Sequence, residues 1–384
     1  MPQPRRESLF PPHGSCPSGR EAAATSERLD VLFREMDRMI CEEPDTSNSF
    51  SVLREREIAS RAFALWERAM CRNDAAHPLM RAVRRPALGQ AVRDLLGTWP
   101  EPSAGSCAET APLVRLLDAL EETPLSEEFC RVEKAMQGRM SNANRVAEAV
   151  RSDPVLAALL LRLVNSPFYG VGRRVDSLQR AVAFAGFDEL SALALVVAVV
   201  RAFGGSSGFW RRSVLCGVLS KALARRAGLS GQWFFAAGLL HDVGGLLARM
   251  VVPGTYGAFV RSLADGATPW ERLEKKYLGI TTPELGVRLL SRKGMPESVA
   301  ELVGRRRGTG SSEDPGTAAL HVAEVLAASM TVGRSSGDVV IPELHVACWE
   351  MLGLGVRDVE TLLPEALAQA VRIAGGMPGL PGKK

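Results

Sequence analysis

The chain has 384 residues, of which 46% are hydrophobic, 23% charged and 6% aromatic, and its formal net charge is +4. This length is enough to bury a full core, and the balance is that of an ordinary globular protein. The small net charge excludes a chain dominated by a basic or an acidic tail, and the scarcity of aromatic residues favours helices over a β-sandwich.

Residues 1–22 are rich in Pro, Gly and Ser and are predicted to be disordered. Residues 23–97 are predicted to form a small helical N-terminal region. It contains a helix capped by Ser26, a second through Ile58–Met70, and a weaker pattern over Val83–Leu96 that Pro86 interrupts. Residues 98–112 have the composition of a linker, helical patterns then continue from 113 to 374, and residues 375–384 form a disordered tail.

The clearest helix of the 113–374 region begins at Asp153, a suitable N-cap, with Pro154 in its first position, and ends at Asn165. Residues 305–317 are expected to be a flexible loop. Because no segment shows convincing alternation of apolar and polar residues, the predicted fold class is all-α. The other expected helices begin at Asp176 and Asp188 or cover Trp210–Ala227, Gly231–Asp242 (with Gly244 and Gly245 as its stop signal), Ala318–Val332, Pro342–Leu352 and Val356–Ala374.

The seven cysteines are far apart and form no CxxC pair, which indicates reduced thiols rather than disulfides or a zinc cluster. The N-terminus lacks the apolar stretch of a signal peptide. The longest apolar run, Leu190–Val200, is shorter than the roughly 20 residues that span a bilayer. We therefore expect a cytoplasmic protein that does not insert into a membrane.

His241 and Asp242 form the one motif that carries chemistry, at the end of the apolar helix in GLLHDVGGLL. An imidazole and a carboxylate at a helix end can both bind a divalent metal. The dipeptide also occurs by chance. In that case the histidine donates to a backbone carbonyl and the aspartate caps the following turn.

The sequence around this motif resembles the HDOD family, the HD-related output domains of bacterial signalling proteins, over roughly residues 113–374. The resemblance is carried by the NSxxYG element of residues 165–170, the Phe209-Trp210-Arg211 opening and the AGLLHD element that ends at Asp242. It implies a multi-helix HD-like bundle and a role in signal transduction.

The related HD phosphohydrolases hold their metals with further histidines and a distal aspartate, and the resemblance implies where these ligands would fall. Other residues stand there: Arg212, Pro283, Gly304, Arg305 and, for the distal aspartate, Glu324. The two remaining ligands, His241 and Asp242, are too few to hold a catalytic metal ion. An arginine at a ligand position also repels a divalent cation. His321 is the only spare candidate ligand, whereas His345 is expected to face solvent. We therefore predict no catalytic residue, metal or cofactor, with His241 and Asp242 as vestiges.

Three functions remain open. The first is a non-enzymatic output or regulatory module that binds a protein partner or a small signalling ligand, with the N-terminal helices as its input region. The second is a residual metal-dependent phosphohydrolase acting on a nucleotide or cyclic dinucleotide, which only His241 and Asp242 support. The third is a sensor in which Arg212 and Arg305, with His241 and Asp242, bind an anionic nucleotide without hydrolysing it. Nucleic acid is not expected as a partner.

Overall fold

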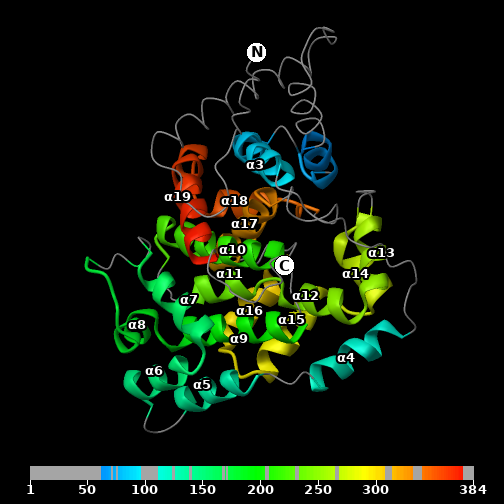
Figure 1. The fold of residues 1–384 in the computed structure, drawn as a ribbon. Coiled ribbons are helices and arrows are strands. Elements are labelled where there is room, and N and C mark those ends of the chain that lie inside the picture. Colours follow the sequence, from blue (N-terminus) through cyan, green and yellow to red (C-terminus); the bar gives the residue numbers. More distant parts are fainter. Residues whose placement is uncertain are drawn as a thin grey trace, which may run out of the picture.

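The computed structural model describes residues 62–374, apart from 71, 75–76, 97–110, 123–125, 138–140, 167–168, 170–171, 204–206, 230–232, 264–267, 308–313 and 332–339. Every regular element within the described residues is a helix, which confirms the all-α prediction (Figure 1). The helix expected after Ser26, the two predicted disordered ends and nearly all of the predicted linker lie outside this part of the chain.

The N-terminal helical region packs directly on the C-terminal helices. Residues 62–69 are helical, and α3 (Pro78–Leu96) runs through Pro86 and starts earlier than the sequence suggested. The α3 helix contacts α17 (Pro315–Ser329) and α19 (Val356–Ala374), and its buried Leu79 and Val83 belong to the main hydrophobic cluster. The two regions therefore share one core.

The first half of the 113–374 region is a group of short helices around α9. The α7 helix follows the sequence prediction, because Asp153 Oδ1 accepts hydrogen bonds from the backbone N–H of Val155 at 3.0 Å and of Leu156 at 3.1 Å. Arg201 of α9 donates to the same carboxylate, at 2.6 and 2.9 Å. The helices are α4 (Pro112–Glu122), α5 (Glu127–Gln137), α6 (Ala143–Arg151), α7 (Pro154–Val164), α8 (Leu178–Ala185) and α9 (Phe187–Phe203).

The second half is built around α10, which contacts α11, α17 and α19. The α12 helix lies against α15, and α13 and α14 pack together at one edge (Figure 1). The helices are α10 (Ser207–Arg226), α11 (Trp233–Leu240), α12 (Val243–Val251), α13 (Pro253–Leu263), α14 (Trp270–Leu278), α15 (Thr282–Arg292), α16 (Glu297–Arg305) and α18 (Val346–Met351).

Several predicted helix boundaries are wrong, and α18 begins at Val346 rather than at Pro342. The N-cap of α8 is Ser177 rather than Asp176, since the Ser177 hydroxyl accepts the N–H of Arg180 at 3.4 Å. Gly244 does not stop a helix but lies in the first turn of α12. A Cβ at Gly244 would lie 2.1 Å from the carbonyl oxygen of Thr282, so glycine is there to let α12 and α15 approach closely.

One described helical stretch, Trp233–Val251, is long and apolar enough to cross a bilayer, and 83% of its apolar window is buried inside the fold. The stretch comprises α11 and α12, which meet at His241 and Asp242. Such burial is typical of a central helix in a globular core.

Candidate functional site

His241 lies in the short turn between α11 and α12, with 1% of its surface exposed. Its Nδ1 donates to the carbonyl oxygen of Gly238 at 2.7 Å, the backbone bond that the sequence suggested. Burial lowers the pKa of His241 to about 4, although the nearby carboxylates of Glu324 and Asp242 raise it. The imidazole is therefore neutral at neutral pH, with the lone pair on Nε2.

Asp242 is held by arginines. It stands at the N-cap position of α12, but its side chain makes no capping hydrogen bond, so the predicted capping role is wrong. Its Oδ2 accepts from Arg212 Nη2 at 3.0 Å, and its Oδ1 lies 3.6 Å from Arg306 Nη2. Burial raises the pKa of Asp242, and Arg212 and the other neighbouring cations more than offset this, so the pKa falls below its ordinary value and the group stays ionised.

Arg306 places a fully buried guanidinium between two carboxylates. Its side chain is 0% exposed, its Nε lies 3.3 Å from Glu324 Oε2, and its Nη2 faces Asp242. Its Nη1 donates to the carbonyl oxygen of Val303 at 3.0 Å, which fixes the group in place. The cation thus occupies the space in which a divalent ion would have to bind Asp242 and Glu324 together.

Arg307 extends the network to α14. Its Nη2 lies 3.4 Å from Glu324 Oε1, and its Nη1 donates to Glu274 Oε1 at 2.9 Å. Its guanidinium lies over the ring of Trp270, 4.3 Å from the centroid, a favourable cation–π arrangement. Glu274 also accepts from Trp270 Nε1 at 3.1 Å and from the Thr282 hydroxyl. The network, called the arginine–carboxylate network below, consists of Arg212, Arg306, Arg307, Asp242, Glu274 and Glu324.

The charges of this network are fixed. Burial by itself would raise the pKa of Glu324, and Arg306 and Arg307 lower it to about 2. Burial lowers the pKa of Arg307, but Glu324 and Glu274 raise it above its ordinary range. At neutral pH, Asp242 and Glu324 are therefore ionised and face guanidinium groups in a buried site.

Not all of the predicted ligand-binding residues come together. Arg212, His241 and Asp242 are in contact or adjacent, as expected. Arg305 does not join them. Its side chain is 64% exposed and lies 3.8 Å from Glu301, on the same helix. Because α16 ends at Arg305, the two arginines after it turn inward, and the predicted flexible loop is wrong for them.

The other positions implied by the resemblance also lack the family's ligands. Pro283 is buried in the first turn of α15, and a Cβ at Gly304 would touch Val287. His321 Nδ1 donates to the carbonyl oxygen of Arg306 at 2.9 Å, and its Nε2 accepts the backbone N–H of His345 at 3.1 Å. His345 was expected to face solvent, but it is half-buried and stacks on His321.

A divalent metal does not fit the residues around His241 and Asp242. Each carboxylate that could bind one already has a guanidinium within 3.6 Å. A +1 and a +2 charge about 4 Å apart repel by several kcal/mol at an effective dielectric near 20. A metal there would have to displace Arg306, whose side chain is fully enclosed.

A small cavity of about 40 Å³ adjoins the network. It has room for a few water molecules. Pockets that take drug-sized ligands have volumes of about 300–1,000 Å³, so a nucleotide does not fit unless the walls move. The cavity is lined by Arg212, His241, Asp242, Arg249, Tyr256, Val260, Leu263, Trp270, Arg307, Glu324, Ala328, Val340 and Pro342.

The N-terminal region holds two walls of this cavity. Asn73 Nδ2 donates to the carbonyl oxygens of Ile341 at 3.2 Å and Pro342 at 3.0 Å, and its Oδ1 accepts the N–H of Leu344 at 2.8 Å. Arg72 donates to the carbonyl oxygen of Thr268, and its guanidinium lies 5.9 Å from the centre of the Trp270 ring. The turn around residues 72 and 73 therefore fixes both the 340–344 segment and the start of α14.

Three features of this site were missed at the sequence level. Arg306 and Arg307 were interpreted as solvated loop residues, and Glu274 was not singled out. A signal for Glu274 was present, because it lies four residues after Trp270, which is the spacing of neighbours on one helix face. No signal in the sequence indicated the role of Asn73.

The comparisons with known proteins agree on the fold. Residues 123–307 match the HDOD domain family. The structure is similar to that of a protein from Shewanella amazonensis SB2B named "Putative phosphohydrolase", at 22% identity and a TM-score of 0.53, over 69% of this chain and 98% of that one. An HDOD domain protein of unknown function from Geobacter sulfurreducens gives 22% identity and a TM-score of 0.49, over 68% of this chain and 98% of that one.

A sequence relative is an uncharacterized protein of Treponema pallidum (strain Nichols), 22% identical over 195 residues. The match covers 49% of this chain and 38% of that protein, so the chain spans well under half of that relative's length. The HDOD match includes α5 to α16 and therefore the His241-Asp242 turn and its arginines. Residues 123–307 of this chain therefore form an HDOD domain.

Proposed function

We propose that this protein is a non-enzymatic signal-transduction module on an HD-type scaffold, which acts by binding a protein partner. The observation that carries the proposal is Arg306, whose buried guanidinium lies between Asp242 and Glu324. A hydrolytic metal site needs about three protein ligands and an open position for water. Here the two acids already have a fixed cation as their common partner.

The N-terminal helices are the proposed input region, since their turn at Arg72 and Asn73 holds two walls of the central cavity. A partner that draws this turn away removes three hydrogen bonds of Asn73 at once. The 340–344 segment then loses the hydrogen bonds that connect it to the N-terminal region, and the cavity opens. Such a module works by shifting the balance between closed and open packings of the same helices.

The absence of catalysis is tested with the full chain and a panel of phosphomonoesters, nucleotides and cyclic dinucleotides, each supplied with Mn²⁺, Fe²⁺ or Mg²⁺. We expect the same background hydrolysis from the wild type and from His241→Ala. Turnover that His241→Ala abolishes would refute the proposal. So would a stoichiometric metal, measured by elemental analysis, that is lost in His241→Ala.

The input role is tested by hydrogen exchange of the backbone amides. We expect Asn73→Ala to accelerate exchange in residues 340–344, because the side-chain bonds that fix this segment are removed. The matched control is Arg68→Ala, an exposed position of the same region. Equal exchange in both variants would show that the N-terminal turn does not hold the cavity walls.

One observation favours an anionic ligand as a second candidate. Arg306 Nε and Nη2 and Arg307 Nε are buried and have no hydrogen-bond partner, although carboxylates lie nearby. Buried donors of this kind are usually satisfied by a water or a ligand oxygen. Arg307 lines the cavity, so an oxyanion there would supply an oxygen to its Nε, and a nucleotide phosphate could do so only after the walls open.

The second candidate is tested by thermal shift with inorganic phosphate, nucleotides and cyclic dinucleotides, on the wild type and on Asn73→Ala. A rise in Tm that is larger in Asn73→Ala and absent in Arg212→Gln supports it. No shift in either of the first two proteins would sink the idea.

A further inference from the structure

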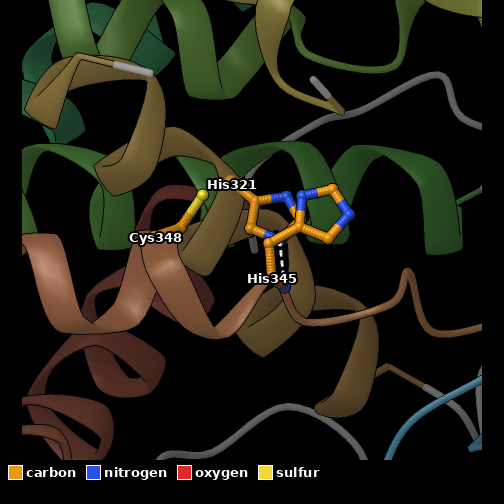
Figure 2. A group of neighbouring side chains, drawn as sticks. All are labelled: His321, His345 and Cys348. Atoms are coloured by element: carbon orange, nitrogen blue, oxygen red, sulfur yellow. Dashed lines mark hydrogen bonds between the residues drawn. The ribbon is translucent and has the colours of Figure 1, made fainter. Parts of the chain in front are cut away.

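His321, Cys348 and His345 gather where α17 meets α18, on the side of α17 that carries the Arg306 carbonyl contact (Figure 2). One ligand atom from each residue lies within 4.8 Å of the other two. His321 and Cys348 are each 1% exposed, and His345 is half-buried. The two imidazoles stack with ring centroids 4.6 Å apart and an angle of 18° between their planes. None of the three takes part in the arginine–carboxylate network.

His321 is oriented as a metal-binding histidine is. Its Nδ1–H donates to the Arg306 carbonyl oxygen at 2.9 Å, so its Nε2 carries the lone pair. Metal-binding histidines in proteins nearly always have such a carbonyl or carboxylate on the other ring nitrogen. The lone pair on Nε2 points at the backbone N–H of His345, 3.1 Å away, which is the contact drawn in Figure 2.

His345 and Cys348 have the spacing of a chelating pair. They lie three residues apart at the start of α18, so that they share one side of the first turn. The His345 side chain makes no capping hydrogen bond to α18, so its rotation costs the helix no cap. Cys348, which supplies the thiol, is buried, and its helix α18 packs against α17.

We propose that His321, His345 and Cys348 bind one Zn²⁺, with water as the fourth ligand. Two imidazoles and a thiolate are a donor set that zinc prefers, and three protein ligands with an open position are common for it. Zn–N bonds of about 2.0–2.1 Å and a Zn–S bond of about 2.3 Å place neighbouring ligand atoms roughly 3.3–3.6 Å apart. The ligand atoms therefore have to approach by up to about 1.5 Å, and His345 is the least buried of the three side chains.

The binding step is balanced in atoms and charge. The Cys348 S–H bond breaks, the sulfur binds the metal as a thiolate, and one proton leaves to solvent. Nε2 of His321 loses the hydrogen bond from the backbone N–H of His345 and binds the metal instead. Glu324 lies one helical turn from His321 and contributes a negative charge on the same helix, which offsets part of the repulsion from Arg306 and Arg307.

The test uses the full, reduced chain and Co²⁺ as a coloured substitute for Zn²⁺. We expect one equivalent of Co²⁺ to give a thiolate-to-metal charge-transfer band, which Zn²⁺ displaces with no further release of protons. Cys348→Ser should abolish the band, and His345→Ala should weaken Co²⁺ binding by more than about tenfold. Cys130→Ser, at a partly buried cysteine elsewhere, and His241→Ala should keep the wild-type band and affinity.

The absence of a band in the wild type, or a band that persists in Cys348→Ser, would overturn the zinc site. If Cys348→Ser does not fold, His345→Ala decides, since this side chain is half-buried and wild-type affinity in that variant would equally reject the site. Loss of Co²⁺ binding in His241→Ala alone would place the metal at the His241-Asp242 turn. That result would overturn both this inference and the proposed function, whereas failure of the zinc site alone leaves the latter untouched.

Discussion

Replacing Arg306 with methionine tests the arginine–carboxylate network most directly. Methionine keeps much of the volume and removes the cation between Asp242 and Glu324. The lowering of the Glu324 pKa from 4.5 to about 2 corresponds to roughly 3 kcal/mol of stabilisation at neutral pH, of which Arg306 supplies the largest favourable part. Breaking a buried ion pair by removing one partner costs about 3–5 kcal/mol. We expect Arg306→Met to lower the free energy of unfolding by about that amount.

The pH dependence of this loss has a definite sign. A carboxylate whose pKa is lowered in the folded state stabilises the protein above its unfolded pKa of about 4.5, and this contribution disappears as the pH falls towards 2. The difference between wild type and Arg306→Met should therefore be full at neutral pH and shrink below pH 4.5.

Urea unfolding followed by circular dichroism measures the effect. The matched control is Arg305→Met, the exposed neighbour whose guanidinium lies 3.8 Å from Glu301, for which we expect a change within about 0.5 kcal/mol. The double variant Arg306→Met/Glu324→Gln should recover part of the lost stability, because it no longer buries the unpaired charge of Glu324. The reasoning is refuted if Arg306→Met costs under about 1 kcal/mol, or if Glu324→Gln adds to the loss instead of relieving it.

Further predictions concern the core and the helix ends. Gly244→Ala would place a Cβ 2.1 Å from a backbone oxygen of α15, so we expect the free energy of unfolding to fall by more than about 3 kcal/mol, or no folded protein. The control is Gly172→Ala, where the space is open and we expect a change within about 0.5 kcal/mol. Equal urea midpoints for the two variants would contradict this. Burial outweighs Lys221 and raises the pKa of Glu189 to about 7. Between pH 4.5 and 7 the folded protein thus holds a proton that the unfolded chain has lost, and stability falls by roughly 3 kcal/mol as the pH rises through this window. Glu189→Gln should gain stability relative to the wild type between pH 5 and pH 8, and a pH-independent difference would rule this out. Asp153→Ala removes a cap of α7 and an ion pair whose arginine is partly exposed, and should cost about 2 kcal/mol. Asp153→Asn keeps the cap and should cost less, and thermal unfolding ranks the two variants.

The sequence predicted the features that depend on neighbouring residues. Asp153 and Pro154 mark the start of α7 because the cap bonds reach only two and three residues ahead. The end of α10 before Gly228 follows from the positive φ of 75° that this glycine adopts. The all-α class and the HDOD resemblance were confirmed for the same reason: apolar periodicity and short motifs are local signals.

The sequence did not predict features that depend on distant contacts. A glycine such as Gly244 often ends a helix, and only the close approach of Thr282 shows that glycine is needed here for helix packing. The arginines after α16 stand at the start of a segment, residues 305–317, whose sequence is typical of a solvated loop. Their burial requires Asp242, Glu274 and Glu324, which lie on three other elements. Arg305 was singled out because the position of a family histidine falls on it, whereas the structure buries the next residue, Arg306.

The three bonds of Asn73 have a consequence for any ligand of this protein. Under the proposed input role, the closed cavity and the docked N-terminal region belong to one state of the protein, so opening the cavity and releasing the N-terminal helices cost the same free energy. By reciprocity, a molecule that holds the cavity open raises the affinity of a partner for the released N-terminal helices by the same factor by which that partner raises the affinity of the cavity. A titration of one ligand at several concentrations of the other would therefore measure the coupling from both ends, and the two values must agree.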